Sequence, residues 1–396
     1  MPIFASFVAL SGRILRGNGK RPEWVNDVIG TSLEQGQPFS ASVTATGIPA
    51  VTYSVTSGSL PNGLTLNSST GAISGTPSAA GSFNFTITAS NGVGSVSTSY
   101  TRTVALPPPS AVDYIVAGGG GAGGRQATFM TWIRISKNAG QSGYLGGAGG
   151  GAGGYKSTWA GSSGTEKSGA NTSVLSPLSV SPGTAYTVTV GAGGAHPSGT
   201  GRGSSGSASQ FASTSVSGGG GGGYGCCSGG ATGLAGGSGG GGGGRIGGDY
   251  GSCSGTGSCG GGGGGGGTSG QGYAGGAGAS GGNGRNCPGS GAGGAGVESG
   301  GVVGAGLTST ITGSSVTYGP GGKRNGGGAQ PSNTGGGGGG SSTSGSGSGT
   351  AGSSGIVVLR FAGAMPTISA GLTYSTSTVG SDTVLEFTQG TGTVTW

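Results

Sequence analysis

The sequence contains few of the residues that catalyse reactions or bind metal ions. Only 6% of its residues are charged, and His196 is the single histidine. It precedes Pro197 in a Gly/Ser stretch, with no cysteine or carboxylate nearby in sequence, so we expect a solvated loop histidine. The pattern Gly-x-Gly-x-x-Gly does occur, but it arises by chance in so glycine-rich a chain. We therefore expect no enzyme, no metal site and no cofactor.

Long apolar runs are absent as well. No run approaches the roughly 18 apolar residues of a transmembrane helix, so we expect no membrane insertion. Residues 3–10 are apolar, but no basic stretch precedes them, and Arg13 and Arg16 follow where a cleavage site should lie. This does not fit a signal peptide. A protein suited to the outside of a cell can also leave it by lysis, as part of a virus particle.

Clustered positive charge is missing too. The formal net charge is +7, from 16 Lys and Arg against 9 Asp and Glu. The basic residues of the Gly-rich part stand singly, and Lys323-Arg324 is the only adjacent pair there. A nucleic-acid patch needs clustering, and the repeated Arg-Gly-Gly of RNA-binding proteins does not occur. We expect no nucleic-acid partner.

Cysteine is present in small number and in an unusual pattern. No two cysteines have the Cys-x-x-Cys spacing of a zinc or redox site. Disulfides between neighbouring Gly-rich segments would suit an extracellular setting and leave one thiol over. The alternative, that all five stay free as small residues, remains open. The cysteines concerned are Cys226, Cys227, Cys253, Cys259 and Cys287.

Glycine takes the place of the missing side chains, with 110 residues in a chain of 396. An extended polyglycine strand has no internal hydrogen bonds, so every N–H and C=O must find a partner in a neighbouring strand. Only glycine lets backbones approach from every direction, which predicts a polyglycine II-type bundle with turns between the runs. A flexible linker is the alternative. Uninterrupted runs occur at 118–121, 218–223, 239–244, 260–267 and 335–340.

Residues 31–106 alternate in the manner of half-buried strands, with turns at Pro61-Asn62-Gly63 and Asn91-Gly92. This spacing predicts a small antiparallel β-sandwich. The segments from Tyr53 to Leu66, from Gly71 to Pro77 and from Gly81 to Asn91 closely resemble the Ig-like (cadherin-like) repeats of bacterial surface and phage proteins. The resemblance implies a spacer or attachment module. Residues 107–112, with three consecutive prolines, follow as a stiff Pro-rich linker.

Residues 113–363 form the Gly-rich domain, which has three apolar landmarks. Asp113-Tyr-Ile-Val-Ala opens it, Tyr186-Thr-Val-Thr-Val lies inside it, and Ile356-Val-Val-Leu-Arg-Phe closes it. In that order they resemble the glycine-rich domain of bacteriophage tail fibres and tip adhesins. The apolar stretch within 125–144 departs from that pattern. We expect it to pack against the sandwich or a neighbouring subunit, and a binding surface is the alternative.

The two ends of the chain complete the predicted architecture. Residues 1–30 resemble an attachment segment, or alternatively supply an edge strand to the following domain. Residues 364–396 return to strand patterning and resemble the short β units that accompany glycine-rich domains in phage fibres. The predicted fold class is therefore all-β and irregular: a small Ig-like β-sandwich, a polyglycine II-type bundle and a short C-terminal β unit.

Together these features imply a non-enzymatic phage tail fibre or adhesin, located in the virion and extracellular when it functions. We expect it to bind a bacterial surface receptor, either a glycan or an outer-membrane component, and other virion or tail proteins through its N-terminus. A homotrimer and a monomer both remain open. A bacterial cell-surface adhesin or extracellular filament protein is the alternative. Aromatic residues in turns are the candidate receptor contacts, because they offer large contact area at small entropy cost: Tyr155, Trp159, Tyr224, Tyr250 and Tyr273.

Overall fold

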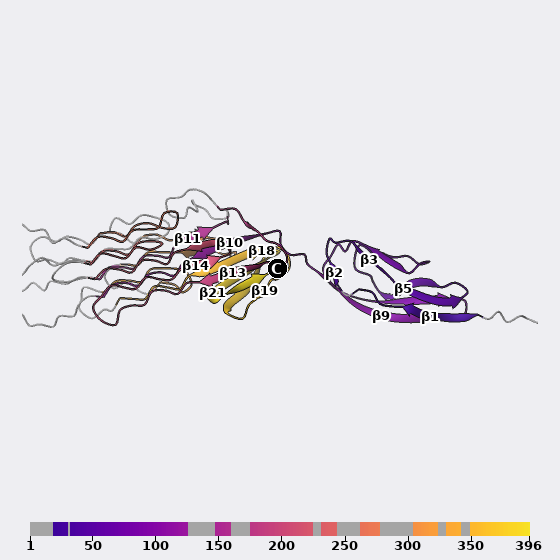
Figure 1. Cartoon of the computed structure of the whole chain (residues 1–396). Coiled ribbons are helices and arrows are strands. Elements are labelled where there is room, and N and C mark those ends of the chain that lie inside the picture. Colours follow the sequence, from indigo (N-terminus) through magenta and orange to yellow (C-terminus); the bar gives the residue numbers. More distant parts are fainter. Residues whose placement is uncertain are drawn as a thin grey trace, which may run out of the picture. The chain divides into compact units, whose positions relative to one another are not determined.

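The structure is a computed structural model of the whole chain. It describes residues 19–30, 32–125, 147–159, 175–224, 231–243, 262–277, 304–323, 330–341 and 349–396. Within these ranges the chain is all-β and contains no helix, which agrees with the predicted fold class. In the same ranges no helix could cross a membrane. The chain divides into two compact units, Met1–Pro107 and Pro108–Trp396 (Figure 1).

The described residues of the first unit form nine strands in three small sheets. One sheet has the order β2-β9-β8-β5, a second has the order β3-β7-β6, and β1 pairs with β4. The strands are β1 Lys20–Asn26, β2 Ser32–Glu34, β3 Phe39–Ser42, β4 Thr44–Ile48, β5 Thr52–Gly58, β6 Leu64–Leu66, β7 Ala72–Gly75, β8 Gly81–Asn91 and β9 Gly94–Ala105.

Alternating apolar residues build the core of this unit. Phe85, Ile87 and Ala89 point inward from β8 and are buried, as the period-2 pattern predicts. The rings of Phe85 and Tyr100 stack with centroids 5.4 Å apart. Strand β1 pairs antiparallel with β4, so residues 20–26 belong to this domain. The Ig-like domain therefore starts earlier than the predicted boundary at residue 31.

The described part of the second unit is organised around a ten-stranded sheet. Its main path is β11-β10-β18-β21-β13-β14-β15, while β12 pairs with β10, and β19 and β20 pair with β21; β16 and β17 form a separate hairpin. The strands are β10 Ala111–Ala117, β11 Tyr155–Ser157, β12 Leu178–Ser179, β13 Ala185–Val190, β14 Ser209–Phe211, β15 Thr214–Val216, β16 Leu307–Ser309, β17 Val316–Tyr318, β18 Ile356–Phe361, β19 Thr367–Ile368, β20 Leu372–Val379 and β21 Asp382–Thr395.

This sheet contains all three apolar landmarks of the sequence. In β10 the side chains of Tyr114 and Val116 lie in one buried cluster, while Ile115 lies in another. A strand buried on both faces needs a continuous apolar run, and β10 and β18 both have one. The long strand β21 pairs with β18 and with β13. Residues 364–396 are therefore part of this sheet and do not form the separate β unit that the sequence predicted. Because β10 begins at Ala111, the linker is also shorter than predicted.

Glycine runs continue from the strands of this sheet, and the run after β10 shows how they are held. The backbone N–H groups of Gly118, Gly121 and Gly124 donate to residues of segment 148–154. The N–H groups of Gly119, Ala122 and Arg125 donate to segment 201–207, and those of Gly120 and Gly123 donate to segment 350–353. Hydrogen bonding thus repeats every three residues, with a different neighbouring segment for each of the three directions.

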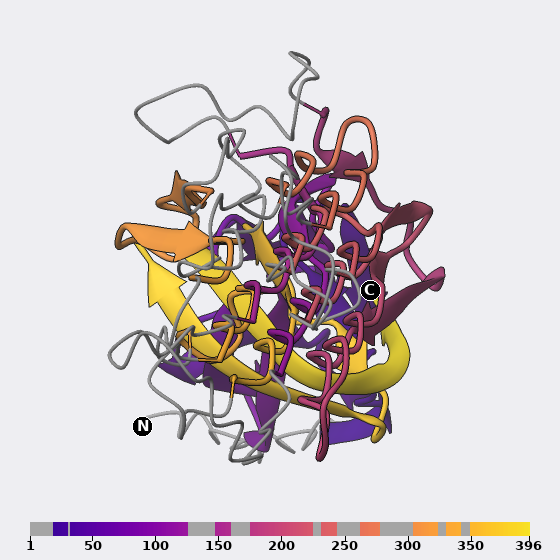
Figure 2. The same ribbon diagram turned by 90° about the vertical axis from the view of Figure 1, so that its left-hand side faces the viewer.

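The carbonyl groups of the same run contact further neighbours. Gly119 and Ala122 accept from segment 219–222, Gly121 accepts from Gly338, and Gly120 accepts from Gly194. The run 118–125 therefore lies among six other segments, and Figure 2 views these runs from the end that is furthest from the sheet. Side chains do not fit at the closest contacts: a Cβ atom on Gly120 would collide with the carbonyl oxygen of Gly336.

Candidate functional site

The ends of the Gly runs that point away from the sheet lie together. Gly124 donates to the carbonyl of Ala148 and accepts from the N–H of Ser341, while Ala148 donates to the carbonyl of Gly223. These residues come just before or just after parts of the chain that lie outside the described residues. We call this the distal end of the glycine block. Figure 1 shows the described runs leading away from the sheet toward it.

The distal end carries positive charge. Arg125, Arg202 and Lys323 lie there: Arg125 pairs with Gly201, and the carbonyl of Lys323 accepts from the N–H of Gly340. Two of these side chains are held in place. The Arg125 guanidinium donates to the carbonyl of Ser198 at 2.6 Å, and the Arg202 guanidinium donates to the hydroxyl of Thr232 at 3.1 Å.

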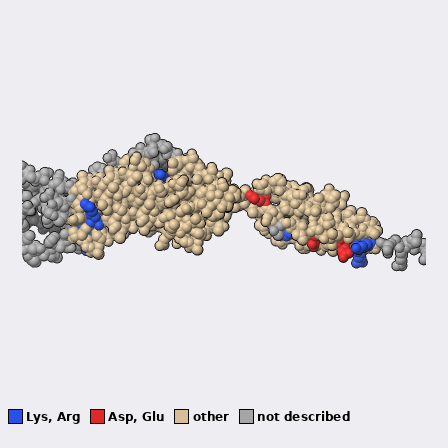
Figure 3. All heavy atoms as spheres, viewed as in Figure 1, with Lys and Arg blue, Asp and Glu red and all other residues tan. Residues whose placement is uncertain are grey.

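The acidic residues of this unit are placed differently. Within the described ranges of the second unit, the carboxylates are those of Asp113, Asp382 and Glu386, and all three lie in strands of the sheet. Figure 3 shows basic side chains at the distal end of the described atoms, with no acidic side chain beside them on the face in view. A group of cations with no carboxylate beside it in the described part of the chain attracts anions by long-range electrostatics.

His196 also lies near the distal end, beside Arg125. Burial lowers the pKa of its imidazole, and the positive charge of Arg125 lowers that pKa further. Its ring atoms lie 3.0 Å from the position that a Cβ atom on Gly349 would occupy, and Nε2 is buried without a hydrogen-bond partner among the described residues. The histidine is thus half-buried, whereas the sequence predicted a solvated loop histidine. In the described part of the chain, no group of three His, Cys, Asp or Glu could hold a metal ion.

Tyr155 does not lie in a turn. It starts strand β11, its side chain is only 1% exposed, and its ring lies 5.9 Å from that of Tyr318. A ring buried this deeply has no surface for a receptor, so the prediction of a receptor contact at Tyr155 is wrong. The reason is that the run 147–154 returns to the sheet, where aromatic residues fill the core.

Trp159 lies near the same place and is half-buried. Its indole N–H donates to the Thr310 hydroxyl at 3.3 Å, and the Arg360 guanidinium lies 4.3 Å from its ring centroid. Arg360 in turn pairs with Asp382 at 2.9 Å. Trp159 therefore covers an ion pair at the sheet. It follows strand β11, so it lies at the opposite end of the run 147–154 from the distal end.

The remaining candidates divide between the two ends of the block. Tyr224 directly follows the run 218–223 and is half-buried at the distal end, where its carbonyl accepts from Ala231. Tyr273 is also half-buried. Its carbonyl accepts from Gly239, and the preceding residue, Ser238, donates to Ala152, which lies just before strand β11. Tyr273 is therefore near the sheet. Tyr250 and all five cysteines lie outside the described residues.

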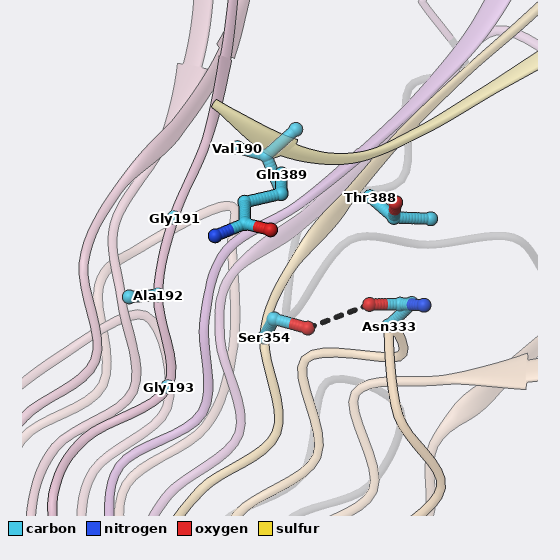
Figure 4. Close-up of a pocket in the computed structure, with 8 residues that line it drawn as sticks. All are labelled: Val190, Gly191, Ala192, Gly193, Asn333, Ser354, Thr388 and Gln389. Atoms are coloured by element: carbon cyan, nitrogen blue, oxygen red, sulfur yellow. Dashed lines mark hydrogen bonds between the residues drawn. The ribbon is translucent and has the colours of Figure 1, made fainter. Parts of the chain in front are cut away.

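A cleft of about 370 Å³ occurs where the runs leave the sheet (Figure 4). Figure 4 shows the Gln389 amide pointing into the space above Ser354, whose hydroxyl donates to the Asn333 side-chain oxygen at 2.7 Å. No charged residue lines the cleft, so its chemistry suits a small uncharged polar group. Its lining comes from four distant segments, and no sequence signal joins them: Val190, Gly191, Ala192, Gly193, Asn333, Ser354, Thr388 and Gln389.

Comparison with known proteins identifies the first unit. Residues 24–105 match the family model described as "Putative Ig domain", so this part of the chain is Ig-like. No curated protein matches the sequence. A crystal structure titled as a putative alpha-galactosidase from Bacteroides fragilis is 26% identical over 22% of this chain and 18% of that chain, with a TM-score of 0.20. The match spans less than a fifth of that enzyme and carries no argument about fold or activity.

Proposed function

We propose that this chain is a structural virion protein, a phage tail fibre or adhesin that attaches the particle to the bacterial surface. An Ig-like domain is typical of surface and adhesion proteins, and the first unit contains one. The observation that carries the proposal is the distal end, where runs from many parts of the chain finish together beside Arg125, Arg202 and Lys323. Under this proposal the protein is not an enzyme, and it acts outside the cell as part of the virion.

We infer further that the glycine block is a polyglycine II-type bundle. Hydrogen bonds that repeat every third residue, with six neighbours around the run 118–125, are what a threefold extended helix makes when such helices pack side by side. Backbone hydrogen bonds between the described runs hold the block together. We propose that the connections between runs vary with the receptor, as loops on a rigid scaffold do.

The chemistry of the distal end favours an anionic receptor. Three cations, with no carboxylate beside them among the described residues, suit the phosphate and carboxylate groups of bacterial envelope glycans. Tyr224, half-buried at the same end, offers a ring that can stack on a sugar. The first unit would then space the block from its attachment point and bind other virion proteins through its N-terminus.

Charge removal at the distal end tests the proposal. The probe is binding of the purified chain to immobilised bacterial lipopolysaccharide, with uncharged dextran as the blank. We expect the double substitution Arg202→Gln and Lys323→Gln to weaken binding roughly twofold to thirtyfold, since each of the two exposed ion pairs contributes about 0.2–1 kcal/mol. Added salt should weaken wild-type binding in the same way.

The control removes the same charge elsewhere. The double substitution Lys156→Gln and Lys20→Gln changes one cation in strand β11 and one in β1, and leaves the distal end unchanged. It should bind as the wild type does. Equal loss in both variants would mean that net charge alone acts, and no loss in either would reject the distal end as the binding surface.

A further inference from the structure

Strand β20 is an edge strand without the usual protection. It pairs along its length with β21, and the described residues form no other strand pairing with it. The side chains of residues 373–378 are all exposed. Natural edge strands are commonly blocked by a charge, a proline or a covering element, because unpaired backbone groups attract another strand. The β20 sequence, Leu-Thr-Tyr-Ser-Thr-Ser-Thr-Val, has neither a charge nor a proline.

The hairpin shows which backbone groups face outward. Gly380 and Ser381 form a two-residue turn with Gly380 at φ 65°, and Val379 pairs with Asp382 on either side of it. The pair that closes such a turn is hydrogen-bonded, and the pattern then alternates along the strands. The N–H and C=O groups of Tyr374, Thr376 and Thr378 therefore point away from β21.

We propose that β20 pairs antiparallel with β20 of a second copy of this chain. A twofold axis through Thr376 sets this residue opposite its own copy, and sets Tyr374 opposite Thr378. From Tyr374 to Thr378, every pair in this register joins uncharged Ser, Thr or Tyr side chains, which are favourable cross-strand partners. The interface is isologous and closes after two copies, so it does not extend into a filament.

The surface of β20 favours a second copy over a foreign strand. Strand addition obtains affinity from the backbone and specificity from pockets for alternate side chains. The exposed positions of β20 have neither charges nor pockets that would select another sequence, whereas the strand is complementary to itself. One strand pair buries less area than a stable interface needs, so the association is concentration-dependent. It is strengthened wherever copies are held close together.

This inference does not depend on the proposed function, and self-association tests it directly. Sedimentation of the full chain should show an average mass that rises with concentration from the 36.4 kDa of one chain toward twice that value. Thr376→Lys sets two like charges against each other at the axis and should abolish the rise. Thr391→Lys is the matched control, because Thr391 is exposed on β21 but lies outside β20. It should dimerise as the wild type does.

A cysteine at the axis tests the register. Residues in a hydrogen-bonded antiparallel pair have Cα atoms about 5.5 Å apart, which a disulfide can bridge. Thr376→Cys should therefore form a disulfide-linked dimer on mild oxidation, whereas Thr378→Cys, which faces Tyr374 of the other copy, should not. No Lys or Arg follows Arg360, so trypsin releases residues 361–396 as one peptide, and mass spectrometry reads the self-linked form without interference from the native cysteines.

Three results would overturn the proposal. A wild-type chain that stays monomeric at every concentration has no such interface. An assembly that persists unchanged in Thr376→Lys, including a trimer, is held by another surface. Equal crosslinking of Thr376→Cys and Thr378→Cys would show random collision and not a defined register.

Discussion

Individual glycines in the block differ in how much space surrounds them, and this difference is measurable. Gly120 is buried, and a Cβ atom there would collide with the Gly336 carbonyl. Gly266 also lies in a glycine run, yet nothing lies within 4 Å of its Cβ position. We expect Gly120→Ala to destabilise the second unit by about 1–3 kcal/mol through overpacking. We expect Gly266→Ala to be neutral or slightly stabilising, because alanine lowers the entropy of the unfolded chain.

Thermal unfolding of the two glycine variants, followed by calorimetry, checks this expectation. The pair is matched in chemistry, since each variant adds one methyl group to a glycine run. Equal melting temperatures would mean that the block has room for side chains throughout. The close approach of its backbones would then not be the reason for its glycine content.

At the scale of elements, the hydrogen-bond pattern predicts an order of protection from amide exchange. The run 118–125 has partners on all sides and its residues before Arg125 are buried, whereas Gly263 and Gly266 at the margin of the block are exposed. Exchange requires a hydrogen bond to open, and segments with few contacts open most easily. We expect the amides of Gly119 to Gly123 to exchange far more slowly than those of Gly263 and Gly266, as measured by NMR after transfer to heavy water. Uniformly fast exchange in both segments would indicate a flexible tether.

The elements also show what the sequence could predict. Continuous apolar runs identify β10 and β18 as buried strands, and alternation identifies β8, because both patterns depend on local periodicity. The position of β21 between β18 and β13 has no such signal, since pairing between strands that are distant in sequence depends on the tertiary arrangement of the sheet. The cleft at Asn333 and Gln389 was missed for the same reason. Tyr155 was misplaced because a tyrosine that follows a glycine run resembles a turn residue, although that run leads back into the core.

At the scale of the whole molecule, the division into two units predicts two independent unfolding transitions. The buried cluster of the first unit lies between Ile29 and Val104, and the clusters of the second unit contain only residues from Val112 onward. Each unit therefore has a core of its own, which is the condition for folding as a separate domain. The two units also rely on different forces, because side-chain burial dominates the first and backbone hydrogen bonds contribute heavily to the second.

One core substitution in each unit tests this independence, and each variant serves as the control for the other. Ile87 and Leu385 are both fully buried, and replacing either by alanine costs about 2–5 kcal/mol. Ile87→Ala should lower the melting temperature of the smaller first unit by roughly 10 °C or more, and Leu385→Ala that of the larger second unit by roughly 5 °C or more. Calorimetry should show each variant shifting one transition and leaving the other in place. A single transition that both substitutions shift would mean that the units stabilise each other, and the first unit would then be part of the rigid block and not a separate spacer.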